Sequence, residues 1–339
     1  MNRSRKIYLD YLNVLSALAV VMLHMNGVVW EFNYGRSWIT ANIIENVFYF
    51  AVPVFFMISG VTLINYSDRY STKEFLKKRF TRTFIPFIFW SLIGLIYFIH
   101  FGEIKTKDLS LLHLIDLIFN TKIVAIYWFF PPLFGLYLSM PILTNINKEK
   151  RKDLFKYLII VGFALTCVEQ FCQIVKIPFN GVTISMASGY VQYLLIGYYI
   201  DNYDIQKRNR MIVYLLGILS LIFVIIAVWK TSYAVGGVDK TFKSYLSPFC
   251  ILYSSALFLF FKHIQYDSLK VLNKIVFFFR NCTFGVYLLH YFVVYYLYFV
   301  LNLNRFSIYM RLFGGLAVFV AVGLLTKVLK HVPVINKLL

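Results

Sequence analysis

The side chain with the clearest chemical potential in this sequence is His24, which lies in the apolar stretch VVMLHMNG at positions 20–27. An imidazole in hydrocarbon surroundings needs a polar partner or a water-lined cavity, and ionisable residues inside a membrane span are functional candidates by default. If the first apolar segment leaves the cytoplasm near Tyr8, His24 lies about 24 Å along the helix axis, in the outer half of the membrane. Two interpretations fit this position: a general base, or a group that only links helices by a hydrogen bond.

Glu169, in the stretch TCVEQFCQ, is a second candidate. Its segment also enters from the inside, near Phe155, which places the carboxylate about 21 Å deep. A carboxylate and an imidazole at matched depth can form a pair in which the carboxylate fixes the tautomer of the ring and raises its basicity. The sequence leaves open whether Glu169 pairs with His24 or faces a watery outer vestibule, because it does not specify how either helix is rotated.

A basic cluster, KKRFTR at positions 77–82, precedes the third apolar segment. Arg79 and Arg82 are three residues apart, so on a helix they share one face and can present two guanidinium groups to a phosphate. The cluster therefore predicts either a phosphate site for a soluble anionic ligand or simple anchoring against anionic lipid.

Further polar residues lie inside apolar segments. His290 is predicted about 12 Å into the ninth segment. Trp128 is followed by Pro131 and Pro132, and this double proline should break or kink its helix, which membranes tolerate mainly where the freed carbonyls are buried or line a cavity. His100, His113, His263 and His331 fall at span ends or in interfacial segments and are interpreted as solvated residues.

The elements that must position these residues are transmembrane helices. The chain has 339 residues, of which 60% are hydrophobic and only 14% charged, whereas soluble domains carry about 25% charged residues. Apolar runs near the length of about 20 residues that crosses a bilayer recur throughout. The sequence predicts an all-α polytopic bundle in the lipid bilayer, as one membrane domain over residues 1–339 without an appended soluble domain. Ten spans are expected, at 8–30, 43–65, 83–101, 123–146, 155–176, 184–201, 211–229, 242–261, 282–302 and 308–333.

The formal net charge of +19 is explained by orientation. Most of the 34 basic residues fall in segments that are cytoplasmic if both termini are inside, as the positive-inside rule requires. No nucleic-acid partner is therefore expected. The four cysteines form no CxxC pair, so neither a disulfide framework nor a metal site is predicted. Amphipathic segments at 107–120 and 268–280 are expected to lie along the membrane surfaces.

Several stretches resemble, in the same order, the blocks of the membrane acyltransferase family 3. They are YLDYLNVLSALAVVMLH, VPVFFMISGVTL, FLKKRFTRTFIPFIFW, YWFFPPLFGLYLSMPIL, YLLIGYYI and CTFGVYLLHYFVV. Each block is mostly apolar and weak alone, but the series extends from Tyr8 to about Val300.

The resemblance implies transfer of an acyl group, usually acetyl from acetyl-CoA, to sugars of cell-surface glycans by a multi-pass protein of the bacterial cytoplasmic membrane. It makes His24 the catalytic histidine and Arg79 and Arg82 the arginines that precede the family's proline, here Pro86. One departure is Asn13, because many members carry arginine eleven residues before the histidine.

The mechanism expected from these residues begins with acetyl-CoA bound from the cytoplasm by Arg79, Arg82 and Lys78. His24 then takes the proton of a glycan hydroxyl as its oxygen attacks the thioester, with Glu169 steadying the imidazolium. Transient acylation of His24 itself is an alternative route. Two rival functions remain: a transporter or flippase of a saccharide, and a non-catalytic partner of other glycan-synthesis proteins.

Overall fold

The computed structural model describes residues 5–179, 181 and 187–339, and within these residues it is all-helical, as predicted. The apolar sequence explains this result, since in lipid only helices satisfy every backbone polar group within one segment. The α-helices are α1 (Ile7–Met25), α2 (Arg36–Phe48), α3 (Ala51–Leu63), α4 (Thr72–Arg79), α5 (Ile85–His100), α6 (Leu111–Phe119), α7 (Phe130–Thr144), α8 (Arg151–Val175), α9 (Tyr190–Asn202), α10 (Lys207–Val235), α11 (Pro248–Lys262), α12 (Lys270–Phe279), α13 (Thr283–Tyr295), α14 (Gly315–Leu329) and α15 (Pro333–Asn336).

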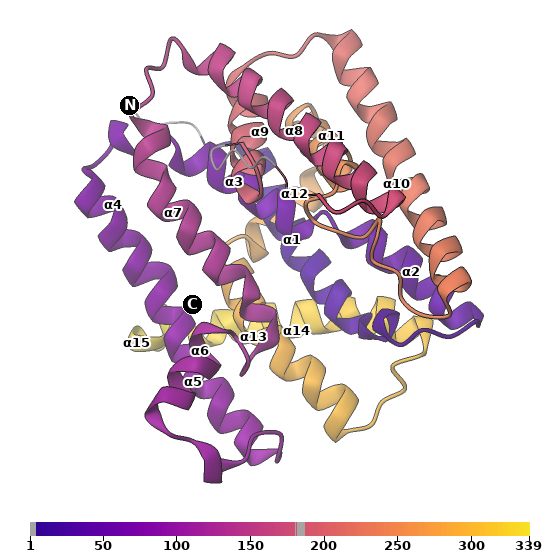
Figure 1. Cartoon of the computed structure of the whole chain (residues 1–339). Helices are drawn as coiled ribbons and strands as arrows, with labels where there is room; N and C mark the ends of the chain where they lie inside the picture. The colour runs from indigo at the N-terminus through magenta and orange to yellow at the C-terminus, as the bar shows by residue number, and fades with distance from the viewer. Residues whose placement is uncertain (1–4, 180, 182–186) are drawn as a thin grey trace.

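Helix α1 is the centre of the bundle (Figure 1), where it packs against α2, α3, α11, α13 and α14. Most of its residues are buried, including two polar ones, Asp10 and Ser16. Helix α10 lies at the edge of the bundle and keeps a long apolar face exposed, for example at Leu215 and Ile218. A helix that is apolar on all sides can serve either as a buried core element or as a lipid-facing one, so sequence alone does not separate these two positions.

Small residues allow the central helices to approach closely. A Cβ atom added to Gly60 of α3 would lie 2.1 Å from the carbonyl oxygen of Leu194 in α9, and one added to Gly197 of α9 would lie 2.3 Å from that of Met57 in α3. Helices in membranes associate through such small-residue contacts because lipid gives no hydrophobic drive for association. The two glycines therefore fix the α3–α9 pair, and α3 in turn packs on α1.

Eight helical segments of the described chain are long and apolar enough to cross a membrane. The other two expected spans, 184–201 and 242–261, correspond to shorter helices, α9 and α11. Residues 184–186 of the first lie outside the described residues. Helix α11 begins late because Ser247 caps it and Pro248 occupies its first turn, which is the position where proline is tolerated. The predicted spans are thus longer than these two helices.

Contacts between helix ends show which segments share one side of the bundle. Near the start of α1, Lys6 contacts Asp201 at the end of α9, and Asp10 contacts Arg280 just before α13. Lys330, after α14, donates to the Asn281 carbonyl at 2.5 Å. The basic residues Lys6, Arg280 and Lys330 lie at this end of the bundle, which we call the basic side. The positive-inside rule predicts that the basic side is cytoplasmic.

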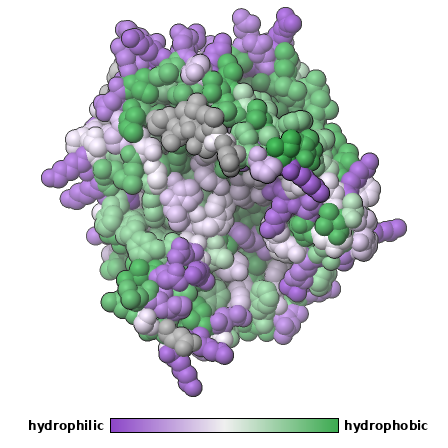
Figure 2. Space-filling view, viewed as in Figure 1, coloured by the Kyte–Doolittle hydropathy of each residue, from purple (hydrophilic) through white to green (hydrophobic). Residues whose placement is uncertain are grey.

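The surface has the distribution expected of a membrane protein. In Figure 2 hydrophobic residues spread over much of the visible face, whereas hydrophilic groups gather towards its margins. The predicted amphipathic segments are short helices: α6 exposes Leu111, Leu112 and Phe119, and α12 exposes Val271 and Leu272. Their apolar faces suit the membrane interface.

Candidate active site

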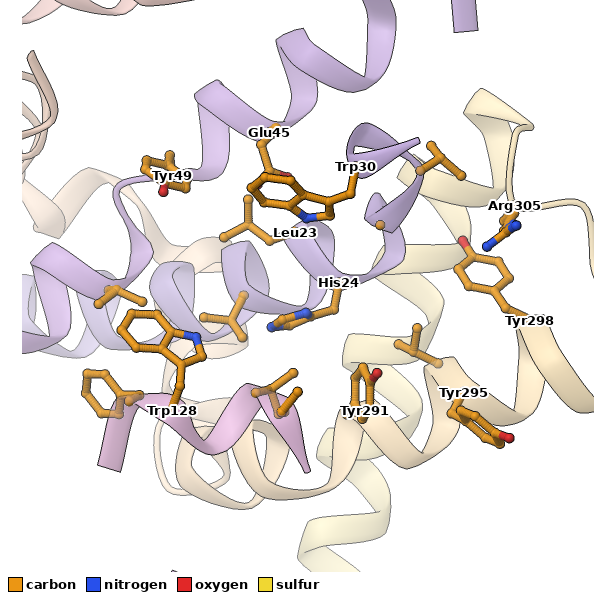
Figure 3. A pocket seen from close by; sticks show the side chains of 18 of the residues that line it. Leu23, His24, Trp30, Glu45, Tyr49, Trp128, Tyr291, Tyr295, Tyr298 and Arg305 are labelled. Carbon is orange, nitrogen blue, oxygen red and sulfur yellow. The ribbon is translucent and has the colours of Figure 1, made fainter. Parts of the chain in front are cut away.

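His24 lines a cavity of about 490 Å³ at the end of the bundle opposite the basic side; we call it the His24 cavity. In Figure 3 its ring lies between Trp30 and Glu45 on one side and Tyr291 on the other. His24 is half-buried, so its ring is both embedded in protein and accessible from the cavity. A volume in this range and a mostly apolar lining with a few polar groups are typical of small-molecule sites.

Aromatic side chains from distant parts of the chain form one wall of the His24 cavity. Tyr49 stacks on Tyr245 with ring centroids 4.0 Å apart, and Tyr245 stacks on Trp128 at 5.5 Å. Trp128 belongs to a 3-10 helical turn, Ala125–Phe129, which gives way to α7 one residue before Pro131. The predicted break in the helix is therefore present, and Trp128 and Phe129, on its 3-10 side, line the His24 cavity.

The charged residues of the His24 cavity are all engaged in ion pairs. At its rim Glu31 pairs with Arg305 at 2.7 Å. Deeper, Glu45 pairs with Lys243 at 3.2 Å, and the side chains of both are almost fully buried. The Lys243 ammonium also lies 3.9 Å from the ring centroid of Trp30. A buried charge is retained only when it is paired, so Glu45 and Lys243 stabilise each other in this wall.

Behind Glu45 a buried polar network anchors the loop that follows α1. Asn26 donates to the Ala41 carbonyl at 2.8 Å and to Glu45 at 3.4 Å. Arg311, at the start of the last span, donates to Asn26 at 3.2 Å and to Thr40 at 2.9 Å. This network fixes the end of α1, only two residues beyond His24.

His290 lies directly beside His24, with ring centroids 5.2 Å apart and an interplanar angle of 37°. Tyr291 also contacts the His24 ring, edge to face at 5.9 Å. Both come from α13, which runs alongside α1 in the same direction, since Asn13 contacts Thr283 at one end and Tyr298 donates to the Met25 carbonyl at the other. The sequence indicates that His290 lies in a span but gives no sign of this neighbour.

Glu169 does not join this site. It is exposed on α8 and does not line the His24 cavity, so the structure does not form the predicted pair with His24. The depth of the two residues was comparable, but the rotation of α8 turns Glu169 outward and its neighbour Gln170 inward, where Gln170 donates to the Thr241 carbonyl at 2.8 Å. Two glutamates line the cavity, Glu31 at its rim and, deeper, Glu45. Glu45 lies near the outer end of the predicted second span, so a comparison of depths over all spans could have found it.

The basic cluster is divided by a π-helical turn, Phe80–Phe84, between α4 and α5. Lys78 is engaged with Glu74 at 2.6 Å and lies over the Tyr70 ring. Arg79 is half-buried, with its guanidinium over the rings of Phe75 and Tyr137 and a buried Nε that has no partner among the described residues. Arg82 is exposed, and π-helical turns are frequent at functional sites.

Arg82 lines an open cavity on the basic side, of about 540 Å³, together with Thr81, Phe284, Asn336 and Lys337. We call this the Arg82 cavity. No ion pair is formed by Arg82 or Lys337 within the described part of the chain. Lys337 is separated from Arg82 by more than 250 residues, and no signal in the sequence indicated that it would lie there.

A third cavity, of about 190 Å³, lies between the other two and is called the middle cavity. It shares Phe284 with the Arg82 cavity, and it shares Phe129 and Tyr287 with the His24 cavity. Asn13, at the position where arginine was expected, lines the middle cavity and donates to Thr283 at 2.9 Å. The three cavities thus form a series from Arg82 to His24 in which neighbouring cavities share aromatic lining residues.

Comparison with known proteins adds the family. No curated protein and no solved structure matches this chain. A family model described as an acyltransferase domain matches residues 6–328. This range includes all the residues that line the three cavities except those in α15 and after it. The match confirms the resemblance on nearly the whole length. The chain therefore belongs to the acyltransferase 3 family and is an acyltransferase with membrane-spanning helices.

Proposed function

We propose that this chain transfers an acetyl group from acetyl-CoA, bound on the cytoplasmic side, to a hydroxyl of a cell-surface or lipid-linked glycan at the outer side, with His24 as general base. In this proposal the protein is a multi-pass component of a bacterial cytoplasmic membrane. The Arg82 cavity receives the donor, and the His24 cavity receives the acceptor.

The observation that carries the proposal is the series of cavities. A coenzyme A thioester has phosphates at one end and a reactive carbonyl at the other, joined by a long flexible arm. The Arg82 cavity offers two cations that have no ion-pair partner among the described residues, Arg82 and Lys337, which suit phosphates. The middle cavity then leads towards His24 between apolar and hydroxyl-bearing side chains such as Ser59 and Thr83, which suit the arm. Arg79 lies beside this route over Tyr137, which lines the middle cavity.

The lining of the His24 cavity supports a glycan acceptor. A sugar ring presents hydroxyl groups at its edge and C–H groups on its faces. Trp30 and Trp128 offer flat aromatic surfaces to those faces, and Glu31 and Glu45 offer acceptors to hydroxyl groups. Because both carboxylates are already paired with cations, the cavity suits an uncharged ring better than an acidic one.

The chemistry requires a base, because a sugar hydroxyl is a weak nucleophile at neutral pH. In the proposed step the hydroxyl proton passes to a cavity-facing nitrogen of His24 while the oxygen attacks the thioester carbonyl carbon. The carbon–sulfur bond then breaks, and the leaving thiolate takes the proton from His24 to become the thiol of coenzyme A. His24 returns to its neutral form, and no other co-reactant is consumed.

The test uses the full chain purified into lipid nanodiscs or proteoliposomes with acetyl-CoA labelled in its acetyl group. Binding or turnover of the labelled thioester, together with labelled acetyl in surface glycans only when the protein is present, would support the proposal. A protein that ignores acetyl-CoA, or a His24→Ala variant that transfers acetyl at the wild-type rate, would overturn it. The first of these results would favour the rival transporter. Acetyl trapped on His24 by rapid quenching would favour the acyl-histidine route over direct transfer.

A further inference from the structure

Of the two described rings that contact the proposed base, that of His290 is the nearer, with centroids 5.2 Å apart. Its side chain has no solvent exposure, and His290 does not line the His24 cavity. Nδ1 of His290 lies 2.8 Å from the carbonyl oxygen of Val286, one helical turn earlier.

The bond to Val286 assigns the tautomer of His290. A carbonyl oxygen can only accept a hydrogen bond, so Nδ1 carries the proton and donates it. In a neutral ring the other nitrogen, Nε2, is then an acceptor. This nitrogen is buried and has no hydrogen-bond partner within the described residues.

Among the described rings that contact His290, one is a candidate donor. These rings are those of His24 and Tyr287. The Tyr287 hydroxyl is already engaged, because it donates to the Ile126 carbonyl at 2.6 Å. His24 has no hydrogen bond of its own in the described structure, and its ring centroid is 5.2 Å from that of His290. At this separation a nitrogen of each ring can reach hydrogen-bond distance when the two nitrogens point at each other.

We infer that His290 is a positioning residue for His24: its Nε2 accepts the N–H of His24 and thereby fixes which nitrogen of His24 faces the cavity as the base. This inference rests on the proposed function. When one nitrogen of His24 takes the proton of the glycan hydroxyl, the N–H on its other nitrogen continues to donate to Nε2 of His290. His290 keeps its own proton on Nδ1. In many enzymes the general base is held in position by a hydrogen bond to a further side chain. Here that side chain is the neutral imidazole of His290.

A merely structural histidine would show a different pattern. Buried polar groups that hold helices together are satisfied by hydrogen bonds, whereas an unpartnered buried acceptor costs stability. An apolar residue of similar size at position 290 would pack in the same space without that cost. A ring with one nitrogen anchored and the other left open beside the proposed base fits an orienting role.

The experiment compares His290→Leu with His290→Gln in the full chain. Leucine removes the acceptor at a small change in volume, whereas glutamine can return a carbonyl oxygen near the position of Nε2. We expect His290→Leu to lower kcat for acyl transfer about 10–100-fold, with the KM of both substrates unchanged. This range is typical of the loss when a residue that orients a metal-ligating histidine is replaced. His290→Gln should recover part of kcat. A wild-type kcat in the leucine variant, or equal losses in both variants, would overturn the inference.

A second readout does not depend on acyl transfer. Diethyl pyrocarbonate acylates neutral imidazole nitrogens, and the modification of His24 can be followed by peptide mass spectrometry. An accepting His290 makes His24 more basic and more nucleophilic, so the rate of modification of His24 should fall several-fold in His290→Leu and be partly restored in His290→Gln. If this pattern appears while no acyl transfer is detected, the proposed function fails and the orientation stands. If transfer occurs but the His24 rate is the same in all three proteins, the orientation fails alone.

Discussion

The His24 cavity and the Arg82 cavity lie at the two ends of one series, yet they treat charge in opposite ways. Around His24 each charged side chain has an opposite partner, Glu31 with Arg305 and Glu45 with Lys243. In the Arg82 cavity the two cations, Arg82 and Lys337, have no ion-pair partner in the described structure. The charges at one end are thus paired within the protein, whereas the cations at the other end are free to pair with an anion from outside.

This difference indicates how one bundle can serve two substrates of unlike chemistry. A cavity whose charges are internally paired gains little from a charged ligand, because that ligand must compete with partners already in place. Exposed cations without partners favour phosphates and attract them over a distance of about one Debye length, near 8 Å at physiological salt. Substitutions at the two ends should therefore give different kinetic signatures.

The largest effect is expected at His24. His24→Gln removes the base but keeps a hydrogen-bonding side chain, and it should lower kcat for acyl transfer about 10²–10⁴-fold, the usual contribution of general base catalysis. The KM for acetyl-CoA should not change, because the donor phosphates are predicted to bind at the other end. His100→Gln, at the exposed end of α5, is the matched control and should behave as the wild type. A rise in KM without loss of kcat would place His24 in binding instead.

The next effect tests whether Glu45 and Lys243 act as a pair. Glu45→Gln leaves the Lys243 ammonium buried without its anion, and breaking a buried pair from one side costs about 3–5 kcal/mol of stability. Thermal unfolding in detergent, followed by tryptophan fluorescence, should show a clear fall in Tm. The double variant with Lys243→Met should recover much of that loss, because it removes both charges. Additive losses in the double variant would show that the two side chains are not coupled.

A smaller effect is expected at the Arg82 cavity. Arg82→Gln and Lys337→Gln should each raise the KM for acetyl-CoA up to about fivefold with kcat unchanged, since an exposed ionic contact is worth about 0.2–1 kcal/mol. The effect should weaken at high salt. The KM for acetyl-pantetheine, which lacks the phosphates, should be the same in both variants as in the wild type. Arg208→Gln, an exposed cation on α10, is the control, and an equal rise in KM there would remove the special role of this cavity.

The smallest effect is expected at Glu169. Glu169→Gln should leave kcat and KM within about twofold of the wild type, because this side chain is exposed on α8 and such surface substitutions usually change stability by no more than about 0.5 kcal/mol. Transfer assays beside Glu45→Gln make the comparison direct. A large loss of kcat in Glu169→Gln would restore the role that the sequence analysis first gave it.

The helices, their apolar character and the segments that share one side of the bundle follow from the sequence, because about 20 apolar residues in a row have few alternatives to a membrane helix. His24 was found for the same reason, as a costly residue inside an apolar run. The lengths of α9 and α11 were harder to predict, since each helix begins at a local cap, Gly189 with a positive φ before α9 and Ser247 with Pro248 at α11, rather than at a plain change in hydropathy.

Which residues meet was decided by tertiary structure alone. Depth along a helix can be counted from sequence, and this is why Glu169 was matched to His24. Rotation about the axis cannot be counted when a helix is apolar on all sides, and it is set by close packing, as where Gly315 of α14 meets Met22 of α1. In the folded bundle Glu169 faces outward on α8, and His290, from the far end of the chain, lies beside His24. The sequence by itself determined that an imidazole would lie within an apolar helix, and only the fold decided that its neighbour is another imidazole.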